Sequence, residues 1–344
     1  MKRKRKKIKK KAKNILYSLF AILSVILVAL LAIIVLPKEN KNRKETKPEQ
    51  KEEIVIDNSI EKKLKDLNFS DNDINEIKKY VSEDNINYII NNELDDGLVM
   101  NFVNQDYYID DYLKTYIEYY NNNEFDYRKV VERVNTHVNN EYYTNTIKTD
   151  ESLGKFVLLN KYYYASDSYA AEDLIDVDAE YSLYNTSFKL SKECYEAFLK
   201  MYNDAKEAGY GFKINSPYRS YQKQESLYSR YKQQDGEKLA DTYSARPGYS
   251  EHQTGYAFDI RDYPYTNEDY SKTKSFTWVS ENSYKYGFII RFPKNKEDIT
   301  GYQYESWHYR YCGIECSTYI HKTGITFEEY YEYFIKYENP KNLS

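Results

Sequence analysis

The pattern of hydrophobic and polar positions changes several times along the chain. Residues 15–36 form an apolar run of 22 residues without a charge, whereas residues 37–57 are charged and almost free of apolar side chains. Beyond this stretch, apolar positions recur at helical spacing, as at Ile74 and Ile77, which predicts amphipathic helices. We therefore expect a charged stalk over residues 37–57, followed by a small helical module over residues 58–149.

Beyond residue 150 the pattern predicts short strands between helices. Residues 211–216 and 256–260 have the alternation of strands, while a helix is expected after Ser191 as its capping residue and another over residues 276–286. Helices interrupted by short strands, without a regular βαβ repeat, are typical of the α+β class. We predict an α+β domain over residues 150–335.

The N-terminal residues predict a membrane anchor. Residues 1–14 contain ten Lys or Arg and no acidic residue, and the apolar run after them would be about 33 Å long as a helix, enough to cross a hydrocarbon core. A cleaved signal peptide is the alternative, but its apolar region is usually about 7–15 residues long and precedes a small-residue cleavage site. We therefore expect a basic cytoplasmic tail, a single transmembrane helix over residues 15–36, and an extracellular remainder.

The charge balance bears on possible partners. The whole chain has a net charge of −4, to which residues 1–36 contribute +10, so the remainder carries about −14. Binding to phosphate backbones needs a basic surface, so nucleic acid is not an expected partner. The three cysteines are too few and too scattered for a disulfide framework, and we expect ordinary buried thiols at Cys194, Cys312 and Cys316.

Two short strings near the C-terminus carry candidate chemistry. SEHQTGYAFD contains His252 and Asp259, and ESWH contains Glu305 and His308, so that two of the four histidines each have a carboxylate at a short offset. Two imidazoles and one carboxylate can fill three positions around a zinc ion and leave the fourth for water. The other carboxylate is then free to act as a base on that water. The pattern predicts a catalytic zinc site.

A third string, SPYRSYQKQ, lies upstream and contains Arg219 shortly after Pro217, at the end of the first predicted strand. An arginine held beside a zinc site can stabilise the oxyanion that forms when water attacks a carbonyl group. It can also bind a substrate carboxylate, and spacing alone equally allows an ordinary surface arginine.

Together the three strings resemble the LAS metallopeptidases, in particular D-alanyl-D-alanine carboxypeptidases of the VanY type. The resemblance covers roughly residues 150–335. It also includes the strings ARPGYS, KYGF and TGY. The matching positions of the two main strings are Ser250, His252, Gly255, Ala257, Asp259, Glu305, Trp307 and His308. This chain differs from the usual pattern at Tyr249 and Tyr256, where a histidine and a smaller apolar residue are common.

The resemblance implies the small α+β fold that these peptidases share with the hedgehog signalling domain. It implies that zinc is bound by His252, Asp259 and His308. It further implies that Glu305 is the base and that Arg219 stabilises the transition state, with Gln224 and Ser250 helping to hold the site or the substrate. The expected function is a membrane-anchored extracellular zinc carboxypeptidase that removes the C-terminal D-alanine from peptidoglycan stem peptides.

Several alternatives remain open at this point. The same chemistry could act on a tetrapeptide stem as an L,D-carboxypeptidase, or inside a stem or cross-bridge as an endopeptidase. The chain could also be a non-catalytic wall-binding protein with a peptidase fold, although such a protein need not retain Glu305 together with all three ligands. We expect a structural role for His137, and we expect His321 to lie outside the zinc site.

Overall fold

The computed structural model describes residues 58–338. The expected basic tail, transmembrane helix and charged stalk, over residues 1–57, lie outside the described residues. Within the described part of the chain, every helix is too short or too polar to cross a membrane.

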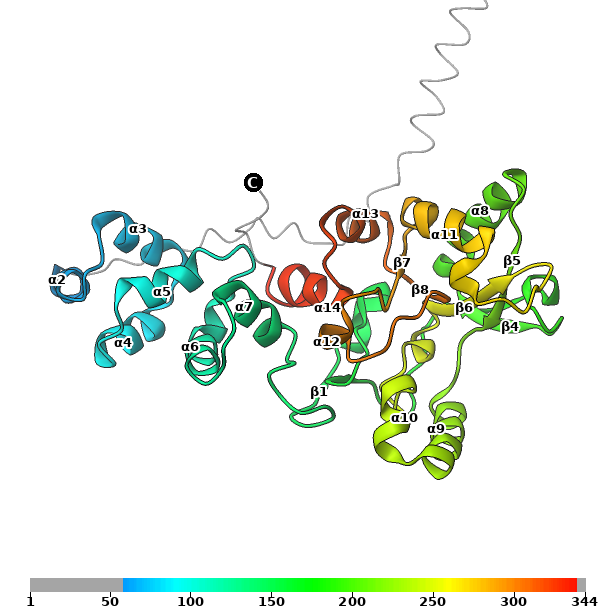
Figure 1. The fold of residues 1–344 in the computed structure, drawn as a ribbon, viewed down its shortest axis with the longest axis horizontal. Coiled ribbons are helices and arrows are strands. Elements are labelled where there is room, and N and C mark those ends of the chain that lie inside the picture. The colour runs from blue at the N-terminus through cyan, green and yellow to red at the C-terminus, as the bar shows by residue number, and fades with distance from the viewer. Residues whose placement is uncertain (1–57, 339–344) are drawn as a thin grey trace, which may run out of the picture. The chain divides into compact units, whose positions relative to one another are not determined.

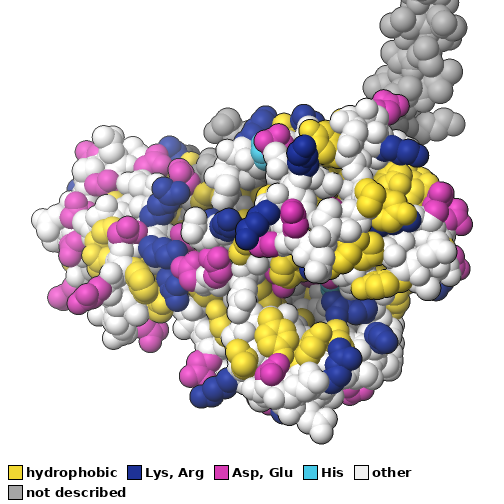
Figure 2. Space-filling view, turned by 45° about the vertical axis from the view of Figure 1, so that its right-hand side comes forward, with side chains coloured by type: hydrophobic (Ala, Val, Ile, Leu, Met, Phe, Trp, Pro, Cys, Tyr) yellow, Lys and Arg dark blue, Asp and Glu magenta, His cyan; other side chains and the backbone are white. Residues whose placement is uncertain are grey.

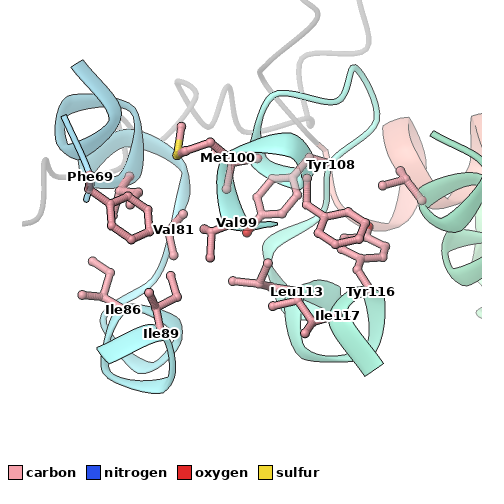
Figure 3. Close-up of a cluster of buried hydrophobic side chains, with 14 of the residues drawn as sticks. Phe69, Val81, Ile86, Ile89, Val99, Met100, Tyr108, Leu113, Tyr116 and Ile117 are labelled. Atoms are coloured by element: carbon pink, nitrogen blue, oxygen red, sulfur yellow. The ribbon is translucent and has the colours of Figure 1, made fainter. Parts of the chain in front are cut away.

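Six short helices form the N-terminal part of the described chain, as the periodicity predicted. Their bounds are α2 Asn58–Asp66, α3 Asp71–Tyr80, α4 Glu83–Asn91, α5 Asp96–Val103, α6 Leu113–Asn121 and α7 Tyr127–Asn135. Polar side chains begin several of them, and α3 starts with a full capping box between Ser70 and Asp73. The helices share one core, in which Phe69, Ile89 and Val99 point toward one another (Figure 3).

The second part of the chain mixes helices and strands, which confirms the mixed α and β content expected beyond residue 150. Four antiparallel strands form its main sheet in the order β5-β6-β8-β7. Their bounds are β5 Phe212–Ser216, β6 Ala257–Asp262, β7 Phe288–Ile290 and β8 His308–Tyr311. Two smaller pairs consist of β1 Ile147–Lys148 with β2 Tyr163–Tyr164 and β3 Leu174–Val177 with β4 Phe188–Ser191.

Helices surround this sheet (Figure 1). Their bounds are α8 Lys192–Glu207, α9 Tyr221–Asp235, α10 Glu237–Tyr243, α11 Lys274–Asn282, α12 Glu297–Thr300, α13 Ile314–Thr323 and α14 Phe327–Tyr330. Phe198 of α8 packs against Phe212 and Phe258 of the sheet, with ring centroids 6.0 and 5.5 Å apart, and Val279 of α11 belongs to the same buried cluster. The two helices therefore help to bury one face of the sheet, which leaves the other face for polar chemistry.

Two local expectations need correction. Ser191 precedes α8, but its hydroxyl donates a hydrogen bond to Asp173 at 2.7 Å, and Asp173 instead accepts from the backbone N–H of Glu193 at 3.4 Å. A side chain distant in sequence thus takes over the capping role. The expected helix over residues 276–286 ends at Asn282 and continues as a 3-10 turn that stops at Gly287.

Candidate metal centre and active site

Two of the predicted site residues lie directly opposite each other on neighbouring strands. Asp259 of β6 pairs in register with His308 of β8. Successive side chains of a strand point to opposite faces, so Phe258 and Tyr309 enter the apolar core while Asp259 and His308 point to the other face. The register of two strands therefore brings together residues that are 49 positions apart in the sequence.

His252 reaches the same place from a 3-10 turn, Glu251–Thr254, that precedes β6. Its Nδ1 lies 2.8 Å from the carbonyl oxygen of Pro217, and its own carbonyl accepts the backbone N–H of Arg219 at 3.0 Å. Because the carbonyl of Pro217 can only accept, the proton sits on Nδ1 and the Nε2 lone pair is free. The turn ends at Gly255 with a φ of +72°, where an added Cβ would lie 2.6 Å from a leucine methyl group, so glycine is required there.

The three side chains form a group that can hold a metal ion. One donor atom from each of His252, Asp259 and His308 lies within 4.8 Å of the other two. Asp259 Oδ1 is 2.9 Å from His308 Nδ1 and 3.6 Å from His252 Nε2. Two imidazole nitrogens and one carboxylate oxygen, with a fourth position toward a pocket, are the donor set of a catalytic zinc site. The residues present therefore fit zinc.

The charges around this group favour a bound cation. Burial, together with the nearby Arg219 guanidinium, lowers the pKa of His252 to about 4, so its imidazole is neutral and ready to bind a metal. Although burial alone would lower the pKa of His308, its hydrogen bond to Asp259 and the nearby Glu251 carboxylate raise it to about 9. Without a metal, a proton thus occupies His308 between two carboxylates, which is where a divalent cation would be favoured.

Glu305 lies at the edge of this group, with Oε2 at 3.8 Å from His308 Nδ1. Its backbone N–H donates to the carbonyl of Phe292 at 3.0 Å, which fixes the loop that carries it. Burial raises the pKa of Glu305 to about 7, despite the neighbouring His308. A carboxylate with a pKa near neutrality can both accept and return a proton, as a general base requires.

Arg219 lines the same pocket, and its Nε atom is buried although the residue as a whole is partly exposed. Its Nε has no hydrogen-bonding partner among the described residues. Burial lowers the pKa of its guanidinium, while Asp259 and Glu305 favour the charged form. A buried guanidinium with an unsatisfied donor beside the base is suited to bind an oxygen that gains negative charge during the reaction.

These residues line one pocket with a volume of about 230 Å³. That is below the ~300–1,000 Å³ typical of sites for drug-sized ligands, so the pocket suits a small group such as a terminal residue. Gln224 and Ser250 line it too, but Gln224 Nε2 donates to the carbonyl of Ala245 at 2.7 Å, so this amide also has a structural role. Trp307 and Tyr249 form part of the wall.

Some functional surroundings were not expected from the sequence. Tyr249 faces the pocket, whereas Tyr256 is buried in the core and stacks on Tyr311, so only one of the two departures from the family pattern affects the pocket. Glu251 is buried beside His308, although sequence reasoning passed over it. Its only sequence signal is its position next to His252.

The outer surface carries charges of both signs, and Figure 2 shows Lys and Arg interspersed with Asp and Glu.

Comparison with known proteins places the chain in a family. The family model described as VanY, D-alanyl-D-alanine carboxypeptidase, matches residues 187–314, which include all seven predicted site residues. YodJ of Bacillus subtilis (strain 168), which bears the name of a carboxypeptidase, is 41% identical over 192 residues, covering 54% of this chain and 70% of YodJ. The chain belongs to the VanY family. It is therefore a metallo-carboxypeptidase, and the triad is a group of side chains that could hold its metal.

Other VanY-type relatives support this assignment. A D-alanyl-D-alanine carboxypeptidase of Enterococcus faecium is 33% identical over 187 residues, which cover 52% of this chain and 58% of the relative. Among solved structures, that of the LdcB LD-carboxypeptidase matches with a TM-score of 0.51 and 37% identity, covering 55% of this chain and 91% of LdcB. Each of these similarities covers about half of the chain.

Proposed function

We propose that this VanY-family enzyme is a membrane-anchored extracellular zinc carboxypeptidase that removes the C-terminal D-alanine from peptidoglycan stem peptides. One observation carries the chemical part of the proposal. His252, Asp259 and His308 converge beside the largely buried Glu305 in the lining of one small pocket. The substrate part is supported by the matching family model and by the enterococcal relative, which are named for D-alanyl-D-alanine carboxypeptidases.

Each side chain has a distinct task in this reaction. When bound by the triad, zinc polarises a carbonyl group and makes water more acidic. Glu305 takes the proton from the attacking water and then delivers it to the nitrogen of the departing D-alanine. Arg219, with its free Nε, donates to the oxyanion that forms on the attacked carbonyl. The side chain of Trp307 at the pocket wall helps to exclude bulk water.

The placement of the enzyme is proposed from its N-terminal sequence. The basic residues 1–14 and the uncharged run 15–36 support a single-pass anchor with the catalytic domain outside the cell. Protease added to intact cells should then degrade the catalytic domain and spare the N-terminal tail. Resistance of the whole chain to that protease would contradict this placement.

A specific observation favours a second candidate substrate. The LdcB structure, which is similar over 91% of its length, is that of an LD-carboxypeptidase, an enzyme with the alternative bond preference. In that case the pocket would accept a tetrapeptide stem, whose final D-alanine follows an L-centre. Both candidates release D-alanine and use the same triad together with Glu305 and Arg219.

The test is to incubate the purified full-length chain with pentapeptide and tetrapeptide stems, with and without a chelator, and to measure free D-alanine. We expect chelator-sensitive release from the pentapeptide. Release from the tetrapeptide alone would establish the second candidate instead. If neither peptide releases D-alanine while zinc is confirmed to be bound, the proposed function is wrong.

A further inference from the structure

A second buried charge cluster lies directly behind the zinc site. Glu251 follows Ser250 in the turn that carries His252, yet its side chain points to the other histidine. Its Oε2 lies 3.7 Å from His308 Nε2, and neither of these two buried atoms has a hydrogen-bonding partner among the residues that the structure describes. Both side chains are at most 5% exposed, so water does not readily substitute for the missing partner.

The carboxylate of Glu251 is held in place by two fully buried arginines. Its Oε1 accepts from Arg291 Nε at 2.7 Å and lies 3.0 Å from Arg310 Nη1. Arg291 is in turn fixed by a bidentate pair with Glu328, at 2.6 and 2.9 Å. Because this network occupies Oε1, only Oε2 remains for the imidazole.

This arrangement determines which nitrogen of His308 can face the metal. His308 Nδ1 lies toward Asp259, whereas Nε2 lies toward Glu251. Both neighbours are carboxylates, but Asp259 belongs to the triad and its oxygen would serve the same ion as Nδ1, which leaves Glu251 as the carboxylate that holds a ring proton, on Nε2. We propose that Glu251 is a positioning residue of the zinc site, which holds His308 with its proton on Nε2 and so presents Nδ1 to the metal.

The proposal rests on the zinc site but not on the identity of the peptide substrate. Its readouts are the state of His308 and the affinity for zinc, so it can fail while the proposed carboxypeptidase function holds. A purely structural role for Glu251 would change the stability of the fold without a selective effect on the metal. The two roles are therefore separable by experiment.

The first experiment uses the unaltered protein. The full-length chain, labelled with ¹⁵N in its histidine side chains and loaded with zinc, has only four imidazoles to resolve by NMR. We expect His308 to carry its proton on Nε2 and to bind zinc through Nδ1. A proton on Nδ1, or zinc bound through Nε2, would overturn the proposal. This measurement needs no variant and therefore stands even if a variant fails to fold.

The second experiment compares two conservative variants of the same buried network. Glu251→Gln removes the carboxylate beside His308, whereas Glu328→Gln removes an equally buried carboxylate that contacts Arg291 but lies one step further from the metal. Zinc affinity is measured by competition with a chelator, and folding by circular dichroism. We expect a roughly 10–100-fold loss of zinc affinity for Glu251→Gln and a far smaller change for Glu328→Gln. Equal losses in both variants, or no loss in either, would contradict the proposal.

Discussion

Two largely buried clusters among the described residues bring histidine and carboxylate together, and they differ in how their polar atoms are paired. In the first, His252, Asp259 and His308 surround a common centre. In the second, His137 Nε2 lies 3.0 Å from Oε1 of Glu332. Glu332 belongs to the helical turn Tyr331–Lys336 that follows α14. Both clusters are shielded from solvent, so burial alone does not make one of them a metal site.

In the second cluster, the carboxylate of Glu332 is already paired with protein hydrogen-bond donors and a lysine. Glu332 accepts from His137, from the hydroxyl of Tyr163 and from Lys336 Nζ at 3.0 Å. At the zinc site the balance is reversed, because the carboxylates of Asp259, Glu305 and Glu251 surround two imidazoles. There, His308 Nε2 and Glu251 Oε2 have no hydrogen-bonding partner among the described residues. The zinc site thus differs from the second cluster in its excess of carboxylates, which a divalent cation would balance.

The largest expected effect is the loss of bound zinc when a histidine of the first cluster, but not of the second, is replaced by alanine. His252→Ala or His308→Ala removes one of three ligands, so bound zinc and carboxypeptidase activity should fall to background. His137→Ala should retain its zinc, since its imidazole already has protein partners, and His321→Ala should do so as well because His321 stacks on Tyr284 outside the pocket. Metal content of the purified full-length variants checks this. Loss of zinc from His137→Ala would remove the distinction between the clusters.

The next effect separates the base from the ligands. Glu305→Gln should lower kcat by about 10²–10⁴-fold, because the proton acceptor is lost, while zinc content stays at the wild-type level. Activity and metal should be measured on the same preparation. Full activity in this variant would refute the assigned base, and a parallel loss of zinc would make Glu305 a ligand instead.

A somewhat smaller effect is expected at the arginine. Arg219→Met should reduce kcat by about 10²–10³-fold, since a donor to the oxyanion is lost, and zinc should remain bound. Arg128→Met, in an exposed position of α7, is the matched control and should leave the kinetics unchanged. If Arg219→Met raised only KM, the guanidinium would bind the substrate rather than stabilise its transition state.

The smallest effect concerns the stability of the paired cluster. Burial opposes the charge of Glu332, but hydrogen bonding to His137 and the charge of Lys336 keep its pKa below the usual range. A lowered folded-state pKa stabilises the fold above about pH 4.3, the unfolded value, and this stabilisation is lost as the pH falls further. Glu332→Gln should thus cost about 1–3 kcal/mol at pH 7 and progressively less below pH 4. A pH-independent cost in denaturant unfolding would show that the charge is not responsible.

Much of the zinc site follows from local sequence patterns. Alternation along β6 places Asp259 on the face opposite Phe258, and Gly255 permits the turn that carries His252 beside it. The third ligand comes from a strand that was not predicted, because the four residues of β8 show no alternation of polar and apolar type. Its motif, rather than its secondary structure, identified His308.

The surroundings of the site were harder to predict, since they depend on contacts between distant segments. Glu251 is indistinguishable from a surface acid in the sequence, and only the positions of Arg291 and Arg310 show that it is buried. The same holds for α8, whose cap is supplied by Asp173 rather than by the adjacent Ser191. Sequence rules that consider only neighbouring residues do not predict contacts between side chains that lie far apart in the chain.

The most direct test of the zinc site is to titrate zinc into the metal-free full-length chain while measuring D-alanine release from both stem peptides. A single zinc site formed by the triad predicts no release without metal and a rise in activity that ends at one zinc per chain. Appreciable D-alanine release by the metal-free protein would contradict it, as would activity that does not change while zinc occupies the site.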